Sequence, residues 1–215
     1  YSNNITIYAM PTASFTLNSA AQCLSGNSVI MTNTSTNGSG TINNWTWSTV
    51  GGTNNSEVGV GPHTTHYSSA GSYTINLTVT DTHGCSSNTS NTNNVTIYAM
   101  PTAAFTLNSA AQCLSGNSVQ MTDASTNGSG TINTWAWSVV GGTPSSFNVQ
   151  GPNSTIYATA GSKTINLTVT DNNGCSNSTS NSNNVTIYSD PVASFTLNNA
   201  GQCLNGNAVT MTNTS

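Results

Sequence analysis

The amino-acid sequence predicts an all-β protein built from antiparallel β-sandwiches in tandem. One block of sequence returns at a period of ninety residues: residues 3–13 recur as 93–103, and a looser copy occupies 183–193. Apolar and polar residues alternate within each period, which is typical of half-buried strands, and no segment shows the 3.6-residue period of a helix. A period of this length indicates an array of folded modules, and about seven short strands in each indicate a sandwich.

The alternation places the strands along the first period. Val29 and Met31 share one face of the second expected strand, and Trp45 and Trp47 share one face of the third. Residues 53–66 differ most between the copies, so we expect a loop there with a short edge strand. The expected strands of the first period are residues 13–17, 28–32, 44–48, 73–80 and 94–98.

The phase of the repeat predicts the domain boundaries. Two complete sandwiches are expected at residues 11–100 and 101–190. Residues 1–10 resemble the last strand of a preceding module, and residues 191–215 resemble the start of a further one. The sequence is therefore expected to be a window on a longer array, whose neighbouring modules or copies would be its partners in a fibre.

The composition excludes several classes of function. Charged residues make up only 3% of the chain, and Lys163 is its single basic residue. A nucleic-acid interface needs clustered lysine and arginine, so no nucleic-acid partner is expected. No apolar run approaches the ~20 residues that cross a bilayer, so no membrane span is expected in this segment. Disorder is disfavoured, because the apolar residues alternate and include paired tryptophans.

One order of residues through the period resembles a known family. The segment from Tyr73 to Cys85 contains a tyrosine, the run Leu77-Thr78-Val79-Thr80-Asp81 and a Gly-Cys pair. A cysteine, a tryptophan and another tyrosine precede this segment in the period. The residues that carry the resemblance are Phe15, Cys23, Val29, Trp47, Tyr67, Gly71, Tyr73, Leu77, Thr78, Val79, Thr80, Asp81, Gly84 and Cys85. In this order the chain resembles polycystic-kidney-disease (PKD) repeats, and most closely the cysteine-bearing kind in secreted bacterial and archaeal surface proteins.

The resemblance implies an immunoglobulin-like β-sandwich that serves as a spacer, stalk or adhesion module. Its expected core residues are Trp47, Trp137, Tyr67 and Tyr157. One departure concerns the residues after the tryptophan, where the family has Asp-Phe-Gly-Asp-Gly and this chain has residues 48–52 without an acid. This departure removes the basis for calcium binding in that loop.

The cysteines are expected to form disulfides. We favour one bridge inside each period, Cys23 with Cys85 and Cys113 with Cys175, because this pairing repeats within a module and matches the family pattern. The alternative is a bridge from Cys85 to Cys113 that joins neighbouring modules. In either case, disulfides indicate an extracellular or cell-surface location. Cys203 is expected to have its partner beyond residue 215.

The residues that could support catalysis or metal binding do not repeat. His63, His66 and His83 have the counterparts Asn153, Ile156 and Asn173 one period later. The only acidic residue that recurs at one phase is Asp81, whose copy is Asp171, and it is expected to be a turn residue before a glycine. The tryptophan pairs could stack on sugars, but core packing is favoured. The chain is therefore expected to be no enzyme and to need no cofactor or metal.

Acceptor triplets Asn-x-Ser/Thr recur along the chain, and such asparagines can carry glycans on a secreted protein. The repeated acceptors are Asn4, Asn37, Asn76, Asn94, Asn127, Asn166 and Asn184. The sequence therefore predicts a structural repeat protein that forms an extracellular filament or a cell-surface stalk with covalent glycans. The alternative is a carbohydrate-binding or adhesion module, or the spacer region of a secreted adhesin or enzyme.

Overall fold

The computed structural model describes residues 4–89 and 94–215, and among these it contains strands and no helix. No helix that could cross a membrane is therefore present in the described part of the chain. The strands of the first repeat are β1 (Phe15–Leu17), β2 (Ala21–Cys23), β3 (Val29–Asn33), β4 (Ile42–Thr49), β5 (Ser56–Val58), β6 (His63–Thr65), β7 (Gly71–Asp81), β8 (Ser86–Thr89) and β9 (Asn94–Tyr98).

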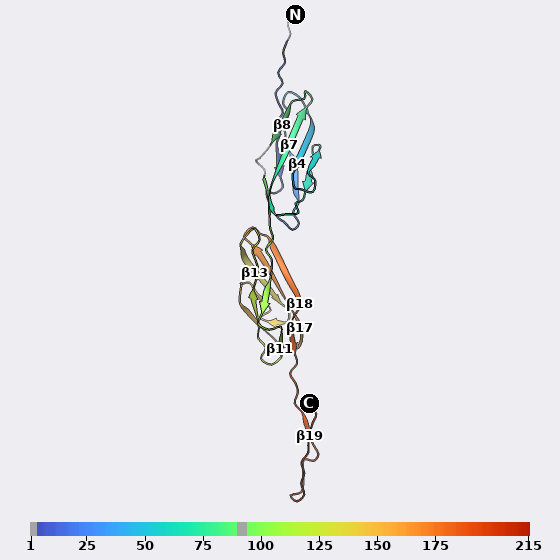
Figure 1. Cartoon of the computed structure of the whole chain (residues 1–215), viewed down its shortest axis with the longest axis vertical. Coiled ribbons are helices and arrows are strands. Elements are labelled where there is room, and N and C mark those ends of the chain that lie inside the picture. Colours follow the sequence, from blue (N-terminus) through green and yellow to red (C-terminus); the bar gives the residue numbers. More distant parts are fainter. Residues whose placement is uncertain (1–3, 90–93) are drawn as a thin grey trace. The chain divides into compact units, whose positions relative to one another are not determined.

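Two sheets form the first sandwich. One has the order β1-β3-β6, and the other has the order β2-β9-β7-β4-β5 with β8 also paired to β7. Figure 1 shows β4, β7 and β8 side by side, and the ladder places Trp47 opposite Leu77. Most pairs are antiparallel as predicted, but β2 runs parallel to β9. Residues 53–66 contain two short strands, β5 and β6, where the sequence predicted one.

The core of the first sandwich follows from the alternation of the sequence. Trp47 on β4 is fully buried, and its ring meets Phe15 edge-on at a centroid distance of 5.3 Å. Val29 and Met31 are also fully buried, on the face that the sequence predicted. Trp45 lies on the same face as Trp47 but is only half-buried, and it packs against the buried cluster. Burial of each such side chain contributes about 1.5–3 kcal/mol or more.

The second repeat has the same architecture. Its strands are β10 (Phe105–Leu107), β11 (Ala111–Cys113), β12 (Val119–Asp123), β13 (Ile132–Val139), β14 (Gly142–Thr143), β15 (Ser146–Phe147), β16 (Asn153–Tyr157), β17 (Gly161–Asp171) and β18 (Ser176–Tyr188). They form the sheets β10-β12-β16-β14 and β11-β18-β17-β13-β15. Trp137 is 2% exposed and repeats the contact of Trp47, with Phe105 at 5.3 Å. The core pattern therefore survives the substitutions between the copies.

Contacts between residues divide the chain into two compact units, and these units do not coincide with the ninety-residue repeats. The first unit comprises Tyr1–Ala103, Ser125–Thr134 and Thr168–Ser178, and the second comprises Ala104–Ala124, Trp135–Leu167 and Thr179–Ser215. Two segments from the second half of the sequence thus pack with the first repeat. These two segments include Ser129 and Cys175.

Residues at both ends repeat core sequences without being buried. Residues 4–8 copy the sequence of β9, in which Val95 and Ile97 are buried, yet Ile5 and Ile7 are 87% and 89% exposed. Near the other end, β19 (Phe195–Leu197) and β20 (Met211–Asn213) form a two-stranded sheet. Phe195 and Met211 in this sheet are 63% and 70% exposed, although their copies Phe15 and Met31 in the first repeat are buried.

Candidate functional site

The cysteines form one bridge, and it is not either of the predicted ones. Cys23 on β2 is bonded to Cys175, with their Cα atoms 5.5 Å apart. Both residues belong to the first compact unit. Cys85 and Cys113 are free in the described structure, as is Cys203. The predicted pairs Cys23–Cys85 and Cys113–Cys175 are therefore wrong, and the alternative pair Cys85–Cys113 is not formed either.

The register of the sheet explains why a bridge inside the repeat cannot form. Cys23 lies opposite Tyr98 on β9, and Ile97 of the same strand lies opposite Gly71, the first residue of β7. Cys85 follows the turn at the other end of β7. Because β7 is 11 residues long, its ends lie about 34 Å apart. Bridged cysteines have Cα atoms less than about 7 Å apart, so the two thiols of one sandwich cannot meet.

A tight turn presents Cys175. The Oδ1 atom of Asp171 accepts hydrogen bonds from the backbone N–H groups of Asn173 and Cys175, each at 2.9 Å. Gly174 completes the turn with a positive φ of 81°, a conformation that glycine adopts without strain. The prediction that this aspartate is a turn residue is confirmed. Cys175 is fully buried, so its position in the bridge is fixed by its surroundings.

The segment that follows β9 is held close to this turn. The Ala99 N–H donates to Ser129 Oγ at 2.7 Å, and the Ser129 N–H donates to the Ala99 carbonyl at 3.1 Å. A side chain at Gly128 would not fit, because its Cβ would lie 2.3 Å from the Ala99 carbonyl oxygen. In addition, Asn177 Nδ2 donates to the Pro101 carbonyl at 2.8 Å. Hydrogen bonds and a disulfide therefore fasten the first unit together around residues 98–101.

The predicted core tyrosines are buried, and the structure adds a partner that the sequence reasoning missed. Asn27 accepts a hydrogen bond from the Tyr67 N–H and donates through Nδ2 to the Tyr67 carbonyl, both at 2.8 Å. Asn117 makes the same pair of bonds to Tyr157. An asparagine does recur at this phase of the period, but a sequence so rich in asparagine does not show which of them is buried. These amides satisfy backbone groups that would otherwise be buried without partners.

Burial also affects the hydroxyl groups of these tyrosines. Among the described residues, neither the Tyr67 hydroxyl nor the Tyr157 hydroxyl has a hydrogen-bond partner. Burial raises the pKa of Tyr67 above its ordinary value, and the nearby Tyr73 adds a smaller effect in the same direction. Burial likewise raises the pKa of Tyr157. Both hydroxyls are therefore structural groups that stay protonated near neutral pH.

The predicted glycan acceptors fall into three groups. Asn4, Asn37 and Asn127 are exposed, although Asn37 and Asn127 each accept a hydrogen bond from a backbone N–H five residues later. Asn76 and Asn166 are half-buried in β7 and β17, and in the described structure their buried Oδ1 atoms lack hydrogen-bond partners. The side chains of Asn94 and Asn184 lie outside the described residues. The structure thus separates the acceptors rather than gathering them into one site.

One histidine has a more specific environment than the sequence suggested. His63 contacts the Glu57 carboxylate through Nδ1, and its ring meets Trp47 edge-on at 5.6 Å. The second repeat has Asn153 and Phe147 at these two positions, so the pair does not repeat. Within the described ranges, no group of three or more His, Cys, Asp or Glu side chains is arranged to hold a metal ion.

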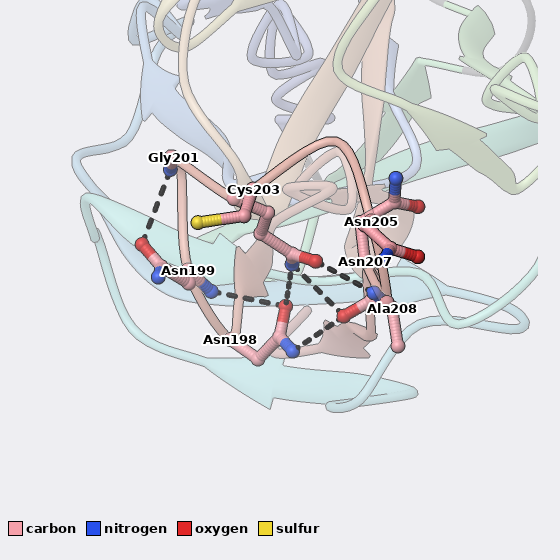
Figure 2. Close-up of a pocket in the computed structure, with 9 residues that line it drawn as sticks. Asn198, Asn199, Gly201, Cys203, Asn205, Asn207 and Ala208 are labelled. Atoms are coloured by element: carbon pink, nitrogen blue, oxygen red, sulfur yellow. Dashed lines mark hydrogen bonds between the residues drawn. The ribbon is translucent and has the colours of Figure 1, made fainter.

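A hollow of about 380 Å³ lies in the last described segment, between residues 198 and 208 (Figure 2). Asn198 Nδ2 donates to the Ala208 carbonyl at 2.9 Å, and the Ala208 N–H donates to Gln202 at 2.6 Å. Asn18 makes the equivalent bond to the Ser28 carbonyl in the first repeat. The hollow therefore belongs to a turn that recurs along the chain, which accounts for its polar lining without a ligand.

Comparison with solved structures finds several β-sandwich proteins of low identity. The fibronectin(III)-like modules of Clostridium thermocellum CbhA are 13% identical over 84% of this chain and 95% of theirs, with a TM-score of 0.38. Carbohydrate-binding modules of the β-sandwich superfamily are 19% identical over 75% of this chain and 54% of theirs, also at 0.38. Sidekick-1 immunoglobulin domains 1–5 are 8% identical over 86% of this chain and 41% of theirs, with a TM-score of 0.29. Scores this low carry no argument about function.

Comparison by sequence is more decisive. No curated protein matches the chain. The family model described as the PKD domain matches twice in tandem, at residues 8–97 and 98–187. Cys23 lies in the first match and Cys175 in the second, so the disulfide joins two consecutive domains. Since the two matches account for most of its length, this protein belongs to the PKD domain family.

Proposed function

We propose that this chain is a non-catalytic structural element of an extracellular filament or cell-surface stalk. The observation that carries the proposal is the bond between Cys23 and Cys175. It gives the two PKD domains a second covalent connection besides the peptide backbone. A spacer that bears tension or keeps a fixed separation benefits from such a connection, whereas a soluble binding module has no need of it.

Two further features support the proposal. The segment around Ala99 is hydrogen-bonded at both its N–H and its carbonyl to Ser129, a residue of the second repeat that belongs to the same compact unit. The domains are also close copies, as expected for a protein whose work depends on length and repetition. Both features favour a mechanical role over recognition by one specialised module.

The extracellular location is supported by the disulfide and by the family, whose domains are typically extracellular. The surface carries hydroxyls and amides instead of charges, with charged residues at 3% of the chain. Glycans on the exposed Asn4, Asn37 and Asn127 would add to the solubility of such a surface. The half-buried Asn76 and Asn166 are poorer acceptors, because a glycan there would have to leave the sheet from between neighbouring strands.

The location test uses gold-labelled antibodies against this chain on native cells. Labels at regular intervals along a thread or stalk would support the proposal, and labels confined to a compact secreted enzyme would contradict it. Binding is tested separately with the purified chain on a glycan array, where a pure stalk gives no signal. A specific, saturable signal would favour the carbohydrate-binding alternative. Intact mass spectrometry of the native protein tests glycosylation, which an unmodified sequence mass would exclude.

A further inference from the structure

Every complete repeat carries two cysteines at opposite ends of its sandwich. The first, which we call the strand cysteine, ends β2 or β11, as Cys23 and Cys113 do. The second, which we call the turn cysteine, follows the Asp-x-x-Gly turn, as Cys85 and Cys175 do. The observed bridge uses a strand cysteine of the first repeat and a turn cysteine of the second. Within the two complete repeats it leaves one thiol of each kind, Cys85 and Cys113, unbridged in the described structure.

The hydrogen bonds around Cys85 reproduce those around Cys175, although Cys85 is half-buried and Cys175 is fully buried. The Oδ1 atom of Asp81 accepts hydrogen bonds from the N–H groups of His83 and Cys85 at 2.9 Å, as Asp171 does in the second repeat. The preceding segment is docked in the same way, because the Ala9 N–H donates to Ser39 Oγ at 2.8 Å and the Ser39 N–H donates to the Ala9 carbonyl at 3.0 Å. The first repeat thus contains the same kind of turn, and the same kind of hydrogen-bonded segment at Ala9, as the two that lie beside the bridge at Cys175.

The strand pairing of Cys113 reproduces that of Cys23. Cys113 lies opposite Tyr188 in a parallel pair of strands, as Cys23 lies opposite Tyr98. The N–H of the next residue, Leu114, donates to the Tyr188 carbonyl at 2.8 Å, and the first repeat has the same bond at the same length. Cys113 is exposed, so a partner can reach its sulfur.

We infer that Cys85 and Cys113 are halves of two further bridges of the same kind. Cys85 bonds the strand cysteine of a PKD repeat that stands before the first one, and Cys113 bonds the turn cysteine of a repeat that stands after the second. The pairing is directional, since each bond needs one thiol of each kind. This inference goes beyond the proposed function, because it assigns partners to two thiols whatever the array is used for.

The chemistry needs an oxidant, which we take to be a low-molecular-weight disulfide such as oxidised glutathione. The first thiolate attacks that disulfide and releases one reduced thiol. The second thiolate then attacks the mixed disulfide, so that the protein S–S bond forms and a second reduced thiol leaves. Two electrons and two protons pass from the protein thiols to the small disulfide.

The test uses the whole chain with one added repeat. A copy of residues 8–97 is inserted after Ile187, with His83→Asn in the copy as a mass tag. The protein is refolded with oxidised and reduced glutathione, its free thiols are alkylated in acid, and it is digested with pepsin without reduction. We expect the Cys113 peptide to be linked to the tagged turn peptide, while Cys23 stays linked to Cys175 and Cys85 is alkylated. The matched Cys113→Ser variant should leave the tagged turn cysteine alkylated.

The unmodified chain provides the second arm, because the flanking repeat could also belong to another copy. Concentrated chain in the same redox buffer is mapped for intermolecular links. Links from Cys113 to Cys85 would support the inference and identify a second copy as a possible source. If the unmodified chain stays monomeric and the extended chain shows the expected link, the inference is supported and the partner repeat belongs to the same polypeptide. Cys113 alkylated in the extended chain, or linked there to Cys85, would overturn it, as would symmetrical Cys85–Cys85 links.

Discussion

Mechanical stretching offers the sharpest test of the Cys23–Cys175 bond. When the chain is pulled from its two ends, tension passes from residue 23 through the sulfur atoms to residue 175. Everything between these residues is shielded, even if it unfolds. Reduction of the bond, or the variant Cys23→Ser, removes the shield. We therefore expect the unfolded chain to become much longer when the bond is lost.

The size of the change follows from the sequence separation. The bonded residues are 152 positions apart, and an extended chain spans at most about 3.5 Å per residue. Loss of the bond should therefore add about 530 Å of contour length. The pairing Cys23–Cys85 with Cys113–Cys175 would instead hide two separate segments of 62 positions each, or about 220 Å apiece.

Optical tweezers can measure this contour length on the chain held by peptide tags at its ends, so that no thiol is used for attachment. Cys23→Ser should give the full increase in oxidising buffer, equal to that of reduced wild-type chain. Cys113→Ser is the matched control, since it removes an unbridged strand cysteine at the same phase of the next repeat. An increase of about 220 Å in both variants, or none in Cys23→Ser, would refute the connectivity and the argument from register.

Three further predictions concern stability. Asn27→Ala leaves the buried N–H and carbonyl of Tyr67 without partners and should cost about 2–4 kcal/mol in urea unfolding; a loss below about 0.5 kcal/mol would contradict the role of that amide. Gly128→Ala should free the segment at Ala99, because the new Cβ meets its carbonyl oxygen; hydrogen exchange there should accelerate, whereas Gly201→Ala, with no atom nearby, should leave it unchanged. The melting temperature should stay nearly flat from about pH 4 to 9, since few groups titrate. The raised pKa of Tyr67 means that the unfolded chain loses its phenolic proton first, so stability should fall above about pH 10. A steep acid transition would contradict the flat profile, and a melting temperature that stays unchanged above about pH 10 would contradict the effect of Tyr67.

The strands and the core could be predicted because their signal is local. Alternation of apolar residues in the segments around Met31 and Leu77 fixes which side chains face inward, whatever the rest of the chain does. The tryptophan of β4 was placed correctly for the same reason, with its neighbour Trp45 on the same face. Repetition at ninety residues helped, since the exposed Ile30 is replaced by Gln120 while the buried Val29 and Met31 recur as Val119 and Met121.

The disulfide could not be predicted, because it depends on which end of the sandwich each cysteine occupies. That in turn depends on the parallel pairing of β2 with β9, which alternation does not reveal. A hint was present in the length of the strand before Cys85, since a run of eleven residues separates its two ends by far more than a disulfide can span. The Asn27 contacts were missed because a single buried amide in a chain rich in asparagine has no local signature.

The loop closed by Cys23 and Cys175 also affects how the protein responds to cleavage by secreted proteases. A single scission of the backbone anywhere from residue 24 to residue 174 opens that loop without separating the molecule into two pieces. The lone lysine, Lys163, lies inside it, so even a completed tryptic cut leaves both products attached until a reductant arrives. Cleavage of one peptide bond in this loop therefore leaves the two fragments joined by the disulfide, and no segment of the chain is lost.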